Sequence, residues 1–253
     1  KGMATIKDEL YLNYDGVNSK DFGLIAVELG SGLYEETLVT NRTINETKPT
    51  KRQQSIFHSI TEDNRSFSLN LAFEDSFDEE KINDVINWLF KEYYRPLYFE
   101  GQEDRVVFAM ISGESNIIHN GMNQGYFTVT VQTNSPYRFS RLRTGSNSGN
   151  SMTLVNNGHE TVYPEFSIKK VGSGDLRIQV DGRSVLITNL NDGEELYIDT
   201  LRDRIITDVV GEYRYDNVTL GELSDLFLDV GSKVYTITGG ANITYRYREA
   251  YKF

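Results

Sequence analysis

The chain has 253 residues, which is enough for one large domain or two domains of ordinary size. Charged residues make up 25% and hydrophobic residues 38%, a composition typical of folded, water-soluble proteins rather than disordered or membrane proteins. Because the sequence has no cysteine and only three scattered histidines, it excludes disulfides and thiolate metal sites, and we expect no metal and no cofactor. The net charge of −11 disfavours a broad phosphate-binding surface.

The longest apolar run, residues 106–111, is much shorter than the ~20 residues that cross a bilayer. No basic leader followed by an apolar stretch opens the sequence. We therefore expect neither a membrane-spanning segment nor a signal peptide.

Residues 37–56 form the first distinctive segment, because they are long, polar and nearly free of apolar side chains. The few apolar residues cannot offset an ordering cost of about 1–2 kcal/mol per residue. Long polar segments inside compact domains are uncommon unless they are functional or disordered. Two interpretations stay open: an arm that becomes ordered against another subunit, and a mobile hairpin tip. The candidate contact residues of such an arm are Arg42, Ile44, Lys48 and Arg52.

Alternating apolar and polar residues predict strands at 67–73, 127–131, 176–180 and 243–247. The dipeptides Asp181-Gly182, Asn120-Gly121 and Gly239-Gly240 predict turns with positive φ between such strands.

One helix interrupts this pattern. The segment Ser76–Glu79 has the sequence of a capping box, and apolar residues follow it at helical spacing. We expect the helix to cover about residues 77–92, with Trp88 near its apolar side and the whole helix packed on a sheet.

Composition and charge divide the chain into two parts. Residues 1–133 hold 12 basic and 21 acidic residues, whereas 134–253 hold 14 and 16. Residues 144–151 have no apolar side chain and are typical of a flexible linker or long loop. We place the boundary near Pro136 and Tyr137, between a domain of residues 1–136 and one of 137–253. The predicted fold class is mainly β.

Catalytic motifs are absent from the sequence. It contains no phosphate-binding glycine loop, no nucleophile elbow and no His-Glu-x-x-His pattern. Adjacent carboxylates such as Glu194 and Glu195 point to opposite faces of a strand, so adjacency does not build an acid/base pair. We therefore expect no catalytic residues and no enzyme.

Seven segments, spread over nearly the whole chain, follow one another in the same order as the characteristic segments of one protein family. They are residues 12–24, the helix end at 87–90, and residues 96–105, 125–137, 156–166, 193–199 and 228–239. This ordered set resembles the distal tail proteins of siphophages, particularly of those infecting Gram-positive hosts.

The resemblance implies an N-terminal tail-tube-like domain that assembles into a hexameric ring, followed by a galectin-like β-sandwich. It implies a structural virion protein, made in the host cytoplasm and located at the phage tail tip. There it would act as the hub that joins the tail tube to the receptor-binding apparatus and leaves a central channel for DNA. The implied partners are further copies of the chain, the tail-tube protein, a tail-tip or tail-associated protein, and receptor-binding or baseplate proteins. DNA would pass without specific binding, and no membrane is involved.

A ring closed by head-to-tail contacts needs two different, complementary surfaces on each subunit. The segment 37–56 is the natural candidate for one of them. Two alternatives remain. The C-terminal sandwich could be a carbohydrate-binding module whose tyrosines contact host cell-wall glycans, and a weaker hypothesis is a glycoside hydrolase that uses Glu74 and Glu100.

Overall fold

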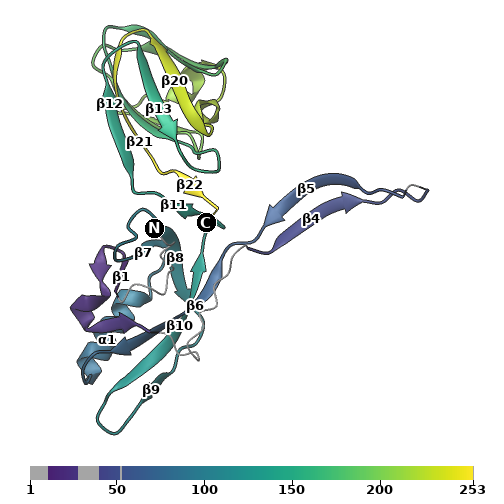
Figure 1. The fold of residues 1–253 in the computed structure, drawn as a ribbon. Helices are drawn as coiled ribbons and strands as arrows, with labels where there is room; N and C mark the ends of the chain where they lie inside the picture. Colours follow the sequence, from purple (N-terminus) through teal and green to yellow (C-terminus); the bar gives the residue numbers. More distant parts are fainter. Residues whose placement is uncertain (1–10, 28–39, 52, 253) are drawn as a thin grey trace. The chain divides into compact units, whose positions relative to one another are not determined.

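A computed structural model describes residues 11–27, 40–51 and 53–252 of the chain (Figure 1). The described residues are mainly β, with a single α-helix among them, so the predicted fold class is confirmed. The chain divides into two compact units: one extends to Arg138 and is rejoined at Lys252, and the other is Phe139–Tyr251. The two units are called the N-terminal and C-terminal units below.

One antiparallel, eight-stranded sheet forms the body of the N-terminal unit, in the order β2-β1-β7-β8-β10-β6-β3, with β9 paired to β10. Its strands are β1 (Leu12–Tyr14), β2 (Val17–Asn18), β3 (Leu24–Ala26), β6 (Ser66–Phe73), β7 (Arg95–Phe99), β8 (Val107–Ser112), β9 (Ile117–His119) and β10 (Gly125–Thr133). The 3₁₀ turn η1 (Ser19–Phe22) precedes β3. The strands predicted at 67–73 and 127–131 are β6 and β10, and each buries one alternating set of side chains.

The helix α1 (Glu79–Leu89) covers the apolar face of this sheet and buries Val85, Trp88 and Leu89. The Trp88 ring stacks on Phe22, and its indole N–H donates to the Tyr14 carbonyl oxygen at 2.9 Å. The prediction of a Ser76 capping box is wrong. Asp78 is the N-cap, and its side chain accepts from the Lys81 backbone N–H.

A separate two-stranded ribbon, β4 (Arg42–Thr47) and β5 (Ile56–Glu62), belongs to the N-terminal unit. Neither strand pairs with the eight-stranded sheet. The ribbon is called the arm below.

The C-terminal unit consists of two five-stranded antiparallel sheets. The first, in the order β12-β21-β14-β17-β18, contains β12 (Arg143–Asn147), β21 (Ala241–Tyr247), β14 (Glu165–Lys170), β17 (Glu195–Asp199) and β18 (Arg204–Thr207). The second, in the order β13-β20-β15-β16-β19, contains β13 (Ser151–Asn156), β20 (Gly231–Thr238), β15 (Gly174–Val180), β16 (Arg183–Leu190) and β19 (Val218–Leu220). Two 3₁₀ turns, η2 (Arg214–Asn217) and η3 (Leu223–Leu226), and the short pair β11 (Arg138–Phe139) and β22 (Ala250–Tyr251) complete the described elements.

The two sheets of the C-terminal unit face each other across an apolar core. Phe166 of the first sheet contacts Tyr235 of the second, with ring centroids 5.9 Å apart, and both side chains are fully buried. At the edge of this core, Glu194 and Arg214 form a buried two-point ion pair, with N–O distances of 2.8 and 2.9 Å. Its neighbour Glu195 is exposed and pairs with Lys169. The two adjacent carboxylates therefore point to opposite sides, as predicted.

Two sequence-based predictions fail in loops. Residues 144–151 are not a linker, because residues up to Asn147 form β12 and pair with β21. A Cβ atom at Gly145 would collide with the Tyr245 hydroxyl, so a larger residue there would displace the Tyr245 side chain. The turn between β9 and β10 has its positive φ at Asn123 (53°) rather than at Asn120-Gly121.

Trp88 should dominate the stability of the N-terminal unit. We expect Trp88→Ala to cost about 3–5 kcal/mol, because it removes a large buried ring and leaves a buried carbonyl without its donor. Asn87→Ala, at an exposed position of the same helix, is the matched control. Hydrogen–deuterium exchange checks this: Trp88→Ala should lower the protection of the β6 and β10 amides, and unchanged protection would contradict the account.

Candidate assembly surfaces

The two faces of the arm differ in chemistry. Ile44 lies directly opposite Ile60, and Glu46 lies opposite Phe57, so these four side chains share one face. The pairing skips His58, and this bulge brings Phe57 onto the face. Ile44, Phe57 and Ile60 are 60%, 60% and 43% exposed. These three residues are called the apolar arm face.

The opposite face of the arm is mainly polar and internally hydrogen-bonded, although Ile56, which lies opposite Thr47 on this face, is 46% exposed. The Asn45 side chain donates to Ser59 Oγ at 3.0 Å and to Thr61 Oγ1 at 3.2 Å, and Thr47 Oγ1 lies 2.8 Å from His58 Nε2. The ribbon thus hydrogen-bonds its polar groups on one side and exposes bulky apolar groups on the other. This arrangement is typical of an interaction surface.

The base of the arm is joined to the predicted domain junction. Arg42 forms an ion pair with Glu62 at 2.7 Å, and the Tyr137 hydroxyl donates to the other carboxylate oxygen of Glu62 at 3.2 Å. Arg65, three residues after Glu62, is buried and donates to the carbonyl oxygens of Pro136 (2.7 Å) and Lys252 (2.6 Å). Burial lowers the pKa of Arg65. These contacts fix the point where the arm leaves the body of the N-terminal unit.

The six predicted site residues thus have definite places, with one exception. Arg42 and Tyr137 contact the same carboxylate, Ile44 lies on the apolar arm face, and Lys48 is exposed in the turn after β4. Pro136 accepts from Arg65, whereas Arg52 lies outside the described residues. Sequence reasoning missed Phe57, Ile60, Glu62 and Arg65. The apolar residues at 57 and 60, just beyond the polar stretch, were the only local signal for them.

One face of the eight-stranded sheet carries no charged side chain in its central strands. This face is opposite the helix. Its residues are Ser66, Ser68, Asn70, Ala72, Phe108, Met110, Ser112, Tyr126, Thr128, Thr130 and Gln132. In a chain with a net charge of −11, these strands therefore present a neutral surface of hydroxyl, amide and apolar groups. It is called the neutral sheet face.

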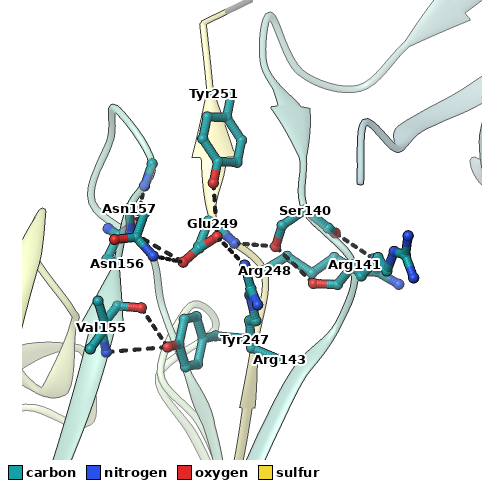
Figure 2. Close-up of polar contacts among 11 residues, drawn as sticks. Ser140, Arg141, Arg143, Val155, Asn156, Asn157, Tyr247, Arg248, Glu249 and Tyr251 are labelled. Atoms are coloured by element: carbon teal, nitrogen blue, oxygen red, sulfur yellow. Dashed lines mark hydrogen bonds and ion pairs between the residues drawn. The ribbon is translucent and has the colours of Figure 1, made fainter. Parts of the chain in front are cut away.

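In the C-terminal unit, the buried carboxylate of Glu249 connects residues near the beginning of the unit with residues near its end (Figure 2). Glu249 Oε1 accepts from the backbone and side-chain nitrogens of Asn157, both at 3.1 Å, and Oε2 accepts from Tyr251 at 2.8 Å and Arg143 at 3.0 Å. The backbones of Glu249 and Ser140 are also hydrogen-bonded. Every oxygen of this buried carboxylate therefore has partners, which indicates a structural role.

The two carboxylates of the hydrolase hypothesis, and some of the tyrosines of the glycan-binding hypothesis, lie at exposed positions. Glu74 accepts from the Tyr11 hydroxyl, and the Glu100 backbone N–H donates to the Tyr11 carbonyl oxygen. Both carboxylates lack the burial that tunes a general acid. In the C-terminal unit, Tyr213 and Tyr215 are 74% and 39% exposed, with ring centroids 5.3 Å apart.

Within the ranges that the structure describes, no group of three or more histidine or acidic side chains could hold a metal ion. No helix in those ranges is long and apolar enough to span a bilayer.

Glu249 should make the C-terminal unit sensitive to acid. Burial by itself would raise the pKa of Glu249, but hydrogen bonds from the Asn157 backbone, Tyr251 and Arg143 outweigh it and hold the pKa below its ordinary 4.5. The stabilisation is therefore complete above pH 4.5 and is lost as the pH falls through the folded-state pKa.

We expect Glu249→Gln to cost about 1.5–3 kcal/mol at pH 7, because an amide nitrogen replaces an acceptor in a buried cluster. The cost should shrink as the pH falls below 4. Urea unfolding over a pH series measures it, with the exposed Glu195→Gln as a control that leaves the midpoint nearly unchanged. A cost for Glu249→Gln that does not depend on pH would refute this reading.

Comparison with known proteins places the chain among phage proteins. Over 254 aligned residues it is 24% identical to the SPbeta prophage-derived uncharacterized protein YomH of Bacillus subtilis (strain 168), covering 97% of this chain and 99% of that protein. The crystal structure of the Dit protein of phage SPP1, described as a paradigm of the hub adsorption apparatus in phages that infect Gram-positive hosts, matches with a TM-score of 0.71 at 13% identity. That match covers 95% of this chain and 98% of the SPP1 chain.

A chain of the phage P2 baseplate in its activated conformation matches with a TM-score of 0.57 at 7% identity, covering 95% of this chain and 98% of that chain. At these identities the structural matches establish the fold, and they confirm at that level the predicted resemblance to distal tail proteins. Residues 7–135, just over half of the chain, match the family model described as "Phage tail protein N-terminal domain". The chain therefore belongs to this family of phage tail proteins.

Proposed function

We propose that the protein is the hub of a phage tail tip: a hexameric ring that joins the tail tube to the receptor-binding apparatus and leaves a central channel for DNA. Its direct partners are further copies of itself, the tail-tube protein and tail-tip or baseplate proteins, and it catalyses no reaction. The apolar arm face carries this proposal, because three large side chains on a ribbon only two strands wide have no second layer within their own sheet. Packing the arm against a neighbouring copy would cover them.

The neutral sheet face supports the channel. Basic side chains would hold DNA through phosphate contacts and counterion release, and dense carboxylates would repel it. A wall of serine, threonine, asparagine and glutamine side chains does neither, so DNA could pass without being held. A neutral face also agrees with the expectation, drawn from the acidic excess of residues 1–133, of a bore that is either repulsive or neutral toward DNA.

Mass measurement on a matched pair of variants tests the ring. Light scattering and negative-stain images of the intact protein should show six copies in a closed ring. A variant in which a short Gly-Ser turn replaces residues 43–61 should keep its fold by circular dichroism but lose the ring, because the apolar arm face is gone. A control variant that changes only Asn45 and Thr61, on the polar face, should still assemble. An intact ring without the arm would contradict its role.

The exposed pair Tyr213 and Tyr215 favours a second candidate, in which the C-terminal unit binds glycans. Aromatic rings exposed side by side provide a surface for the apolar face of a sugar. Saturable binding to host cell-wall polysaccharide, lost in Tyr213→Ala and kept in Tyr163→Ala, would support this function. No binding by the assembled protein at high glycan concentration would dismiss it.

A further inference from the structure

The helix α1 carries a second exposed apolar surface that the packing of the N-terminal unit leaves uncovered. Ile86 and Phe90 lie one turn apart, joined by the hydrogen bond from the Phe90 N–H to the Ile86 carbonyl oxygen, and each is 46% exposed. They are called the helix patch. Tyr93, three residues further on, is 62% exposed and extends the run of exposed apolar residues.

The arm and the helix carry opposite charge. From Arg42 to Glu62 the arm contains four basic and two acidic residues, and Lys48 and Lys51 are exposed in the turn that follows β4. Residues 78–92 contain five acidic and two basic residues. Glu79 and Glu80 are exposed in the first turn of α1. A ribbon of this kind is therefore attracted to the helix of another copy and repelled by a second arm.

The spacing of apolar and charged groups agrees on the two surfaces. Lys48 follows Ile44 by four residues, which is about 13 Å along an extended strand. Glu79 precedes Ile86 by seven residues, which is about 10 Å along a helix. At three- and four-residue steps, Glu79, Asn83, Ile86 and Phe90 also lie on one side of the helix. The apolar and charged groups can thus be in register at the same time.

We propose that the apolar arm face docks along α1 of a neighbouring copy, with Ile44, Phe57 and Ile60 on the helix patch and the lysines of the arm turn beside Glu79 and Glu80. This inference rests on the proposed function, because it names the two complementary surfaces that a head-to-tail ring requires. The contact is heterologous: each copy gives its arm to one neighbour and its helix to the other.

Site-directed cross-linking tests the pairing, and the natural absence of cysteine makes it free of background. The test protein carries Ile44→Cys and Ile86→Cys, and a short thiol-specific bifunctional reagent joins them. The matched control carries Ile44→Cys with Met122→Cys, an exposed apolar residue of the same unit outside the helix. Light scattering first establishes the mass of each variant before the reagent is added.

The expected result is a shift from monomer to a ladder of covalent multimers beyond dimer for the 44/86 variant, and the loss of this ladder in the control. Multimers beyond dimer require that both cysteines of one chain react with different neighbours. If the 44/86 variant does not assemble, Phe57→Cys with Phe90→Cys provides the same test. A ring that yields no more multimer than the control would overturn the docking proposal and leave the ring itself standing. A chain without engineered cysteines that is monomeric at every concentration would overturn both.

Discussion

A ribbon of two strands has two faces and no interior, so the arm cannot bury its own apolar side chains. The arm satisfies the polar groups of one face through Asn45, Ser59 and Thr61 and leaves Ile44, Phe57 and Ile60 open on the other. Among the described residues, β4 and β5 pair with each other and with no strand outside the arm. The hydrophobic effect therefore favours a partner surface, and head-to-tail assembly of identical copies provides one.

The remainder of the N-terminal unit is built to present the arm. Trp88, Phe22 and Tyr14 give the sheet and helix a core of their own, so the unit does not depend on the arm for stability. Arg42, Glu62 and Tyr137 hold the base of the arm through charged and polar contacts. Contacts at the base restrict the directions in which the arm can extend, which reduces the orientational entropy that it would lose on docking.

The sequence predicted elements whose signal is local and missed those that depend on distant partners. Alternation identified β6, β10, β15 and β21, because one face of each strand is buried. The polar segment 144–147 became β12 only because β21 pairs with it and Tyr245 covers Gly145. No local pattern marks such an edge strand.

The candidate site was likewise predicted only in part, because local patterns were visible in the sequence and long-range contacts were not. The unusual polarity of residues 37–56 marked β4 and the turn of the ribbon, whereas β5 (Ile56–Glu62) lies almost entirely beyond that range. The apolar arm face depends on cross-strand pairs and on the bulge at His58. The contacts of Arg65 with Pro136 and Lys252 join residues 71 and 187 positions apart, and those of Glu249 with Arg143 and Asn157 span 106 and 92. Such contacts arise only in the folded chain. The family resemblance, by contrast, was visible in the order of the segments, and the fold bears it out.

The most direct measurement of the central claim is hydrogen–deuterium exchange of the β4 and β5 amides over a dilution series. If a neighbouring copy covers the arm, these amides are strongly protected at high protein concentration and exchange rapidly after dilution to monomer, while β6 and β10 stay protected throughout. Arm amides that exchange at the same rate at every concentration would show that no partner covers the arm and would contradict the account.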